Sequence, residues 1–182
     1  KAAELDVQVP IKGSQLGLIA GAGLYREGNP WGGSPKTESY AISVRYEPGP
    51  KFSLQPFWSQ IDVREDESQP LIFTSGDFLP ARIPRNRFLG QKWADSEAKL
   101  NTFGVVSKGK AIGFDLALGV FRSTFKGIMD HTDLLFGVDP AGAASDRVVV
   151  ADRGNLFGST SGELKVSRNF IDGPRRHTIH AT

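Results

Sequence analysis

The alternation of side chains that decides the fold is clearest in AIGFDLALGV, residues 111–120. Small or charged residues fill every second position, and the positions between them are apolar, namely Ile112, Phe114, Leu116, Leu118 and Val120. Period two is the repeat of a β-strand, whose successive side chains point to opposite faces of a sheet. The segment therefore predicts a strand with one continuously apolar face.

The same period recurs along the chain, in segments 4–11, 16–24, 39–46, 52–63, 100–107, 161–170 and 177–182. No stretch has an apolar pattern at the helical period, so we expect an all-β chain of about eight antiparallel strands, the last one incomplete. Pro56 lies inside one segment, where its missing N–H predicts a bulge or a shifted register. The stretches 64–98 and 123–159 show no clear period and are expected to be irregular.

The connections between these segments alternate between short and long. Turn-forming residues mark the short ones, which are Lys12-Gly13-Ser14, Glu47-Pro48-Gly49-Pro50, Lys108-Gly109-Lys110 and Ile171-Asp172-Gly173-Pro174. The long ones are 27–36, 64–98 and 123–159. Transmembrane β-barrels alternate in this way, because their tight turns lie on the periplasmic side and their long loops outside. We therefore expect an up-and-down transmembrane barrel.

Aromatic residues support a sheet that faces lipid. Tyr46, Phe52 and Phe170 occur in the apolar phase beside short turns, and Trp58 and Phe114 share the apolar phase of their strands. These are the positions of interfacial aromatic girdles and of lipid-facing side chains in outer-membrane barrels. Aromatic residues of a soluble core are expected near the middle of strands instead.

The composition excludes several other classes of protein. The 182 residues contain no Cys, so a disulfide framework, a thiolate metal site and a Cys nucleophile are excluded. The formal net charge is +2, from 22 basic and 20 acidic residues, which does not favour a nucleic-acid partner. The longest nearly apolar run, Leu16 to Tyr25, is about half of the roughly 20 residues that a membrane helix needs.

Three stretches resemble the barrel of TonB-dependent outer-membrane receptors. They are SYAISVRYEPGPKFSLQPFWSQID (39–62), SQPLIFTSGDFLPARIPRNRFLGQKWAD (68–95) and STSGELKVSRNFIDGPRRHTIHA (159–181). The resemblance implies a barrel of about 22 antiparallel strands, blocked by an N-terminal plug, that imports scarce ligands such as ferric siderophores with energy passed on by TonB. The sequence shows no plug, no TonB box and about a third of the strands. We therefore expect residues 1–182 to be a partial barrel, a single unit truncated at both ends.

The resemblance also implies a location and partners. The location is the outer membrane of a Gram-negative cell, and the partners are outer-membrane lipid, the remaining barrel strands and plug domain of the same chain, TonB through that plug, and a small-molecule ligand. It implies no cofactor and no enzyme activity. Two other interpretations stay open. One is a small complete outer-membrane barrel with a structural or adhesive role, and the other is a soluble all-β module that binds a ligand or a carbohydrate.

The long loop supplies the candidate ligand-binding residues, which are Arg64, Asp66, Arg82, Arg85, Arg87 and Trp93. Mixed charge with aromatic side chains suits the capture of an anionic ligand at the extracellular mouth, because a guanidinium binds an anion through two N–H groups. The competing interpretation is a solvated loop whose charges pair with one another.

Three short motifs are weaker. Asp130-His131-Thr132-Asp133 contains oxygen and imidazole donors, yet polar loops produce such clusters by chance. Gly21-Ala22-Gly23 lacks the third glycine and the following helix of a dinucleotide-binding motif. Gly158 to Gly162 has Thr160 where a nucleophile elbow has its serine. We predict no catalytic residue and no metal site.

Overall fold

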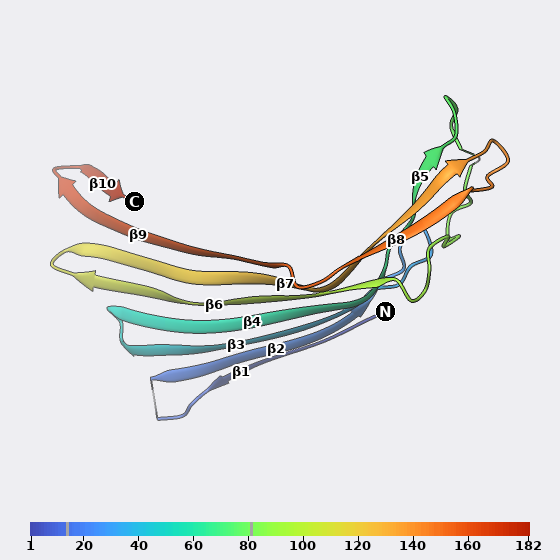
Figure 1. Cartoon of the computed structure of the whole chain (residues 1–182). Coiled ribbons are helices and arrows are strands. Elements are labelled where there is room, and N and C mark those ends of the chain that lie inside the picture. The colour runs from blue at the N-terminus through green and yellow to red at the C-terminus, as the bar shows by residue number, and fades with distance from the viewer. Residues whose placement is uncertain (14, 81) are drawn as a thin grey trace.

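The computed structural model describes residues 1–13, 15–80 and 82–182, and every regular element among them is a β-strand (Figure 1). The strands are β1 (Ala2–Pro10), β2 (Leu16–Arg26), β3 (Lys36–Gly49), β4 (Phe52–Glu67), β5 (Leu71–Thr74), β6 (Asp95–Ala111), β7 (Phe114–Val138), β8 (Asp146–Asp152), β9 (Leu156–Asp172) and β10 (Arg175–Ala181). Within these residues there is no helix long and apolar enough to cross a membrane.

Eight of the strands form the main sheet in the order β1-β2-β3-β4-β6-β7-β9-β10. Each is antiparallel to its neighbour in this order. The predicted all-β, up-and-down arrangement of about eight antiparallel strands is therefore confirmed.

The connections alternate between the two ends of the main sheet, as the sequence predicts. Figure 1 shows short turns at one end, between β1 and β2, β3 and β4, β6 and β7, and β9 and β10. Longer connections lie at the other end, where two of them contain the additional strands β5 and β8. Ser14 of the first predicted turn lies outside the described residues. We call these ends the short-turn end and the long-loop end.

The prediction of irregular structure over 64–98 and 123–159 was wrong in part. β4 extends into the first stretch, β7 runs for 25 residues into the second, and β8 lies inside the second. The pairing of β7 with β6 shifts between Gly127 and Met129, where two steps on β7 match one step on β6. The shift moves the following side chains to the other phase, so no single period of two runs through the segment.

The predicted turn at Lys108-Gly109-Lys110 was also wrong, because β6 continues through it. The turn consists of Ile112 and Gly113, whose φ angles are 52° and 78°. Two consecutive positive φ angles give a tight hairpin turn that matches the twist of the strands, and glycine adopts such an angle at little cost. Lys110 and Asp115 flank this turn and form an ion pair with a nitrogen–oxygen distance of 3.1 Å.

Pro56 lies in the middle of β4, and the bulge predicted there does not occur. β4 pairs continuously with β6 on both sides of Pro56. On the opposite side, the ladder with β3 lapses between Phe57 and Leu54 and resumes in the same register, and the predicted shift of register occurs further along, between Leu54 and Phe52. The Ser43 hydroxyl donates a hydrogen bond of 3.0 Å to the Pro56 carbonyl oxygen. This side-chain contact satisfies a backbone acceptor where the proline has removed the ladder donor.

The two faces of the main sheet differ in polarity. Cross-strand partners share a face, which places Ile42, Trp58 and Phe103 in one row and Leu118 and Leu164 in another. We call this apolar surface the outer face. The opposite surface, the inner face, carries charged, hydroxyl and glycine residues such as Asp6, Ser59, Thr102, Asp115, Gly119 and Glu163.

The described residues do not cover the outer face. Leu118 is 41% exposed and Trp58 is 37% exposed, and the only buried apolar side chains in the described chain are Pro70, Ala94 and Val138. A soluble domain would bury such a face beneath a second layer of secondary structure. An apolar surface of this extent is instead suited to contact with lipid hydrocarbon.

The polarity difference gives a direct test with two adjacent residues of β7. Val120 lies on the outer face, whereas Gly119 lies on the inner face with no atom within 4 Å of the position that its Cβ would take. We expect Val120→Arg to lower the free energy of unfolding of the full native product in lipid bilayers by about 2–4 kcal/mol, because it places a charge in hydrocarbon. Gly119→Arg is the matched control and should have a much smaller effect. Equal effects in urea unfolding would mean that the two faces meet the same solvent.

Candidate ligand-binding site

A second, smaller sheet extends β7 at the long-loop end. β7 pairs there with β5 in parallel orientation and with β8 in antiparallel orientation. Leu71, Leu134 and Val148 form one row across the three strands. We call β5, β8 and the part of β7 that pairs with them the outer sheet; Figure 1 shows it beyond the ends of the other long strands.

One side of the outer sheet contacts the loop between β5 and β6. Asp133 of β7 is 1% exposed, and its carboxylate accepts two hydrogen bonds from Arg147 of β8, one of them 2.9 Å long from Nε to Oδ1. Arg147 also donates to the Leu89 carbonyl oxygen of the loop at 3.0 Å. A buried carboxylate is tolerated only when it is paired and hydrogen-bonded. This guanidinium therefore fixes β8 to β7 and the loop to both.

His131 anchors the end of the same loop. Its side chain is buried, and Nδ1 lies 2.7 Å from the Asp95 carbonyl oxygen. The Ser68 hydroxyl donates to the His131 carbonyl oxygen at 2.6 Å, and Trp93 packs edge-on against the imidazole with 5.8 Å between the ring centroids. Two residues of the Asp130–Asp133 motif thus make structural contacts. The described part of the chain contains no cluster of three or more His, Asp or Glu side chains suited to a metal ion.

The other side of the outer sheet is open and apolar. Its most exposed side chains are Leu71, Phe73, Val148 and Val150, which are between 44% and 55% exposed. Phe73 stacks on Phe136, with 4.9 Å between the ring centroids. We call these five residues the outer apolar patch. An apolar ligand surface that covered it would gain about 25 cal/mol for each Å² of apolar area removed from water.

The outer apolar patch continues the inner face, not the outer face. Before the register shift in β7, the odd-numbered residues belong to the inner face, as Gly119 does. After the shift the even-numbered residues of β7 continue the inner face. Asp130 shows this, because its carboxylate accepts a hydrogen bond of 2.8 Å from Ser96, which lies on the inner face of β6. Leu134 and Phe136 follow Asp130 at even positions along β7. The patch therefore lies above the polar side of the sheet.

A row of carboxylates separates the patch from the inner face of the main sheet. Asp66 pairs with Ser96, Ser96 bonds to Asp130, and Asp152 lies opposite Asp130. These residues lie beyond the apolar part of the strands. Partial burial raises the pKa of the Asp66 carboxyl, and the negative charges of Glu67 and Asp130 raise this pKa further. We call Asp66, Asp130 and Asp152 the acidic row.

The six residues predicted to bind a ligand do not come together in one cluster. Arg64 lies on the outer face, with 4.0 Å between its guanidinium and the Asp62 carboxylate, whereas Asp66 belongs to the acidic row. Arg82, Arg85 and Arg87 are exposed in the loop between β5 and β6. None of these three forms an ion pair with a carboxylate of the described residues.

Trp93 lies on the loop-covered side of the outer sheet against His131, although 63% of it is exposed. The residues that sequence reasoning missed are the outer apolar patch and the Asp133–Arg147 pair. Leu71-Ile72-Phe73 of β5 and the three consecutive valines of β8, 148–150, are uniformly apolar runs. The two faces of a strand cannot be distinguished in such a run, so the sequence carried no signal for the patch.

Comparisons with known proteins point to one kind of structure. No family model matches the chain, and no curated protein matches it. Among solved structures, the ferripyoverdine receptor FpvA of Pseudomonas aeruginosa bound to an iron complex of a heterologous pyoverdine matches 97% of this chain with a TM-score of 0.76 and 19% identity. The outer-membrane ferripyoverdine receptor of the same organism, bound to ferripyoverdine, matches 98% with a TM-score of 0.70 and 16% identity.

The chain has the fold of a segment of an outer-membrane receptor barrel. It spans 24% of the length of each of these two receptor chains. The predicted transmembrane β-barrel strands and the resemblance to a TonB-dependent receptor barrel are thus confirmed at the level of the fold. The matched proteins are receptors, not enzymes.

The Asp133–Arg147 pair predicts which part of the outer sheet loses its ordered structure when the pair is removed. Arg147→Ala leaves the Asp133 carboxylate buried without its partner, a change that typically costs about 3–5 kcal/mol. We expect the full native product to assemble in membranes but to lose amide-exchange protection in β8 and in the loop around Leu89. Arg153→Ala removes an exposed cation near the end of β8 and serves as the control. Unchanged protection in the Arg147 variant would contradict the anchoring role.

The raised pKa of Asp66 predicts a pH dependence. Because the folded state disfavours the ionised carboxylate, Asp66 weakens local stability above its folded-state pKa, and the penalty disappears as the pH falls through that pKa. Asp66→Asn should therefore be at least as stable as the wild type at pH 7, and its advantage should vanish at a pH where both side chains are neutral. Thermal unfolding of the full product at both pH values measures this difference. Destabilisation at pH 7 would show that the ionised carboxylate makes a favourable contact.

Proposed function

We propose that the chain forms part of the wall of a Gram-negative outer-membrane receptor that takes up a scarce ligand such as a ferric siderophore. The likeness of the fold over 97% of the chain to a receptor bound to a ferric pyoverdine carries this proposal. The long-loop end is then extracellular and the short-turn end periplasmic. Residues 1–182 act as one unit of the barrel, and their role is binding and passage of the ligand, not catalysis.

Further strands of the same native product complete the barrel. In the described residues, β1 and β10 are the two edges of the main sheet and do not pair with each other. An unpaired strand edge in hydrocarbon leaves backbone N–H and C=O groups without partners, at several kcal/mol for each group. The remaining strands therefore pair with these edges, and outer-membrane lipid covers the outer face.

The inner face at the short-turn end suits a plug domain. A groove of about 620 Å³ opens there, and its charged lining residues are Glu47, Lys51, Lys108, Lys110, Asp115 and Lys165. Four of these six are lysines, so the groove favours a neutral or acidic protein surface. We assign this groove to the plug of the same native product, through which TonB acts.

The ligand contacts the outer sheet at the extracellular mouth. The outer apolar patch supplies apolar and aromatic surface, and the acidic row supplies hydrogen-bond acceptors directly below it. Arg82, Arg85 and Arg87 of the adjoining loop are the candidates for anionic groups of the ligand, and Trp93 of the same loop is the candidate for an aromatic contact. Arg64 is assigned to the outer face instead, because it pairs there with Asp62.

Binding to the patch can be tested in the full native product. We expect it to bind at least one of a panel of iron-55-labelled ferric siderophores, with ferripyoverdine as the first probe. Phe73→Ser with Val148→Ser should weaken binding of that probe by about tenfold or more, since two large apolar contacts are lost. Leu79→Ser is the control, because Leu79 is 91% exposed in the loop between β5 and β6 and lies outside the patch.

The two parts of the proposal fail in different ways. If no ferric siderophore binds to the wild-type product and none enters cells that express it, the receptor function is wrong. If a siderophore binds equally to the wild type and to the patch variant, the function stands and the ligand site lies elsewhere.

A further inference from the structure

The excess of basic residues in the chain lies at the short-turn end. The four short turns have their tips at residues 12–13, 50–51, 112–113 and 173–174. Eight basic residues lie within five residues of these tips, namely Lys12, Arg45, Lys51, Lys108, Lys110, Arg168, Arg175 and Arg176. The acidic residues in the same range are Glu47, Asp115 and Asp172. Because the whole chain has 22 basic and 20 acidic residues, the rest of it has more acidic than basic residues.

Most of these cations have no carboxylate partner. Two of the three carboxylates are already paired, at nitrogen–oxygen distances of 3.1 Å to Lys110 and 3.7 Å to Arg45. The other six cations are exposed and form no ion pair with a carboxylate of the described residues. Four of the six lie within two residues of a turn tip, and we call these four the basic rim, which consists of Lys12, Lys51, Arg175 and Arg176.

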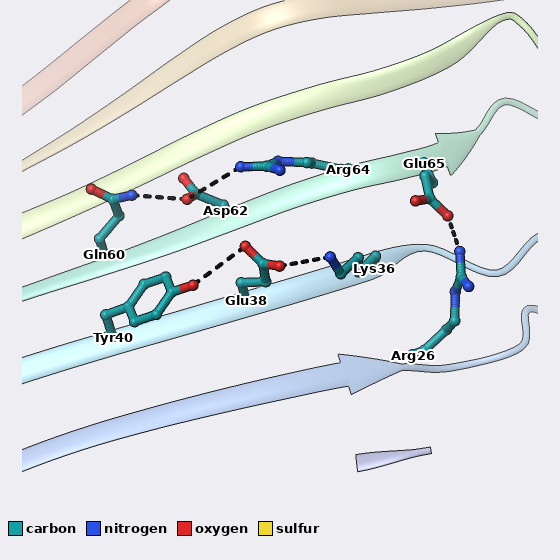
Figure 2. Close-up of polar contacts among 8 residues, drawn as sticks. All are labelled: Arg26, Lys36, Glu38, Tyr40, Gln60, Asp62, Arg64 and Glu65. Carbon is teal, nitrogen blue, oxygen red and sulfur yellow. Dashed lines mark hydrogen bonds and ion pairs between the residues drawn. The ribbon is translucent and has the colours of Figure 1, made fainter. Parts of the chain in front are cut away.

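Several cations near the long-loop end, in contrast, lie beside carboxylates of the chain (Figure 2). Lys36 Nζ lies 2.7 Å from the Glu38 carboxylate. Arg26 pairs with Glu65, which joins β2 to β4 across the strand between them. The charges of these side chains are balanced within the chain. The basic rim lacks such partners, so its charge is available to an external anion.

Hydrogen bonds between neighbouring turns fix the backbone that carries the rim. The Glu47 N–H donates to the Gln15 carbonyl oxygen at 2.8 Å, and Gln15 Nε2 donates to the Pro48 carbonyl oxygen at 2.9 Å. The Lys110 N–H donates to the Lys51 carbonyl oxygen at 2.8 Å. The first three turns are therefore held to one another.

The four turns form a row along the edge of the main sheet (Figure 1). Successive turns are two strands apart, so they recur about every 10 Å and the row spans about 30 Å. A preorganised row of cations binds an extended anion with repeated negative groups better than a single anionic group, since the cost of ordering is met once for several contacts.

The turn between β6 and β7 adds an exposed apolar side chain to this row. Ile112 is 95% exposed, and its φ of 52° lies in the left-handed region, which β-branched residues rarely adopt. Asparagine would suit this position before Gly113 better, since Asn-Gly is the preferred pair for such a turn. Residues held in unfavourable backbone conformations concentrate at functional sites. Ile112 therefore indicates a contact at the turn that offsets both its exposure and its strain.

We propose that the basic rim and Ile112 bind peptidoglycan, the anionic glycan of the periplasm. The inference rests on the proposed function, since it requires the short-turn end to face the periplasm. Peptidoglycan carries short peptides at regular intervals along its glycan strands, and these peptides contain carboxylates and alanine methyl groups. Ammonium and guanidinium groups bind carboxylates through charge-assisted hydrogen bonds, and Ile112 packs against the methyl groups.

The position of the rim suits a partner below the barrel. Arg176 lies opposite Ile171 on the inner face, so it is turned away from the lipid-facing side of the sheet. Lys12 and Lys51 belong to the turn tips themselves. The groove assigned to the plug is lined by Lys51, but not by Lys12, Arg175 or Arg176, so these three stay available when a plug fills the groove.

The experiment mixes the full native product in detergent with purified peptidoglycan sacculi, pellets the sacculi and measures the bound fraction against concentration. Lys12→Gln with Arg175→Gln and Arg176→Gln should weaken binding by about 5- to 20-fold, the combined effect of three exposed ion pairs. Lys92→Gln with Lys126→Gln and Arg153→Gln removes the same charge at the long-loop end and should bind sacculi as the wild type does.

A second variant, Ile112→Asn, separates binding from folding. The Asn-Gly turn suits the two positive φ angles, so this variant should unfold at the same temperature as the wild type or a higher one. It should nevertheless bind sacculi about threefold or more weakly, because the apolar contact is lost. A purely structural role of Ile112 predicts unchanged binding.

Four results would overturn the proposal. They are equal binding of sacculi by the wild type and the rim variant, an equal loss in the long-loop-end control, unchanged binding by Ile112→Asn, and unchanged binding to sacculi whose carboxylates have been amidated. Ferric-siderophore binding is measured on the same preparations. It should be the same in the rim variant as in the wild type, so failure of the peptidoglycan site remains distinguishable from failure of the receptor function.

Discussion

The outer face of the main sheet is an apolar surface with no protein layer over it, and the rest of the structure follows from this constraint. Rows such as Ile42, Trp58 and Phe103 must leave water, yet the described chain buries only Pro70, Ala94 and Val138 among its apolar side chains. Hydrocarbon is the medium that removes the others from water. In hydrocarbon every backbone group needs a partner, which antiparallel neighbours provide along the sheet and which, in the proposed receptor, further strands provide at β1 and β10. The meander and its short turns are both consequences of this one requirement.

Beyond the apolar part of the strands the sheet no longer meets hydrocarbon, and the side chains there are charged, polar and apolar. The Asp133–Arg147 pair holds the outer sheet and its loop together, and this arrangement leaves the outer apolar patch exposed above the inner face. On the other side of the same strands, charged side chains such as Lys99 and Lys126 follow where the apolar rows end. In the proposed receptor, the inner surface at this level serves the ligand and the outer surface serves the membrane. One set of strands thereby presents different chemistry to each.

The sequence predicted the architecture well, because period two and the alternating connections follow directly from a sheet whose faces meet different solvents. It failed where local pairing overrides that pattern. The register shift at Gly127 in β7 and the uniform valines of β8 concealed strand structure, and the Ile112-Gly113 turn displaced the turn expected at Lys108. Of the candidate site, Arg64 and Asp66 were identified as charged residues near the mouth, but the sequence carried no signal that they lie on opposite faces. That separation depends on the shift in pairing between Val63 and Asp66.

The central claim is that the outer face contacts lipid hydrocarbon, and Trp58 reports on it most directly. The full native product would be reconstituted into bilayers with bromine in the acyl chains, and tryptophan fluorescence compared among the wild type, Trp58→Phe and Trp93→Phe. The account predicts that acyl-chain bromine quenches part of the wild-type emission, that this part is lost in Trp58→Phe, and that Trp93→Phe retains it. Emission from Trp58 that resists acyl-chain bromine but is quenched by aqueous iodide would contradict the account.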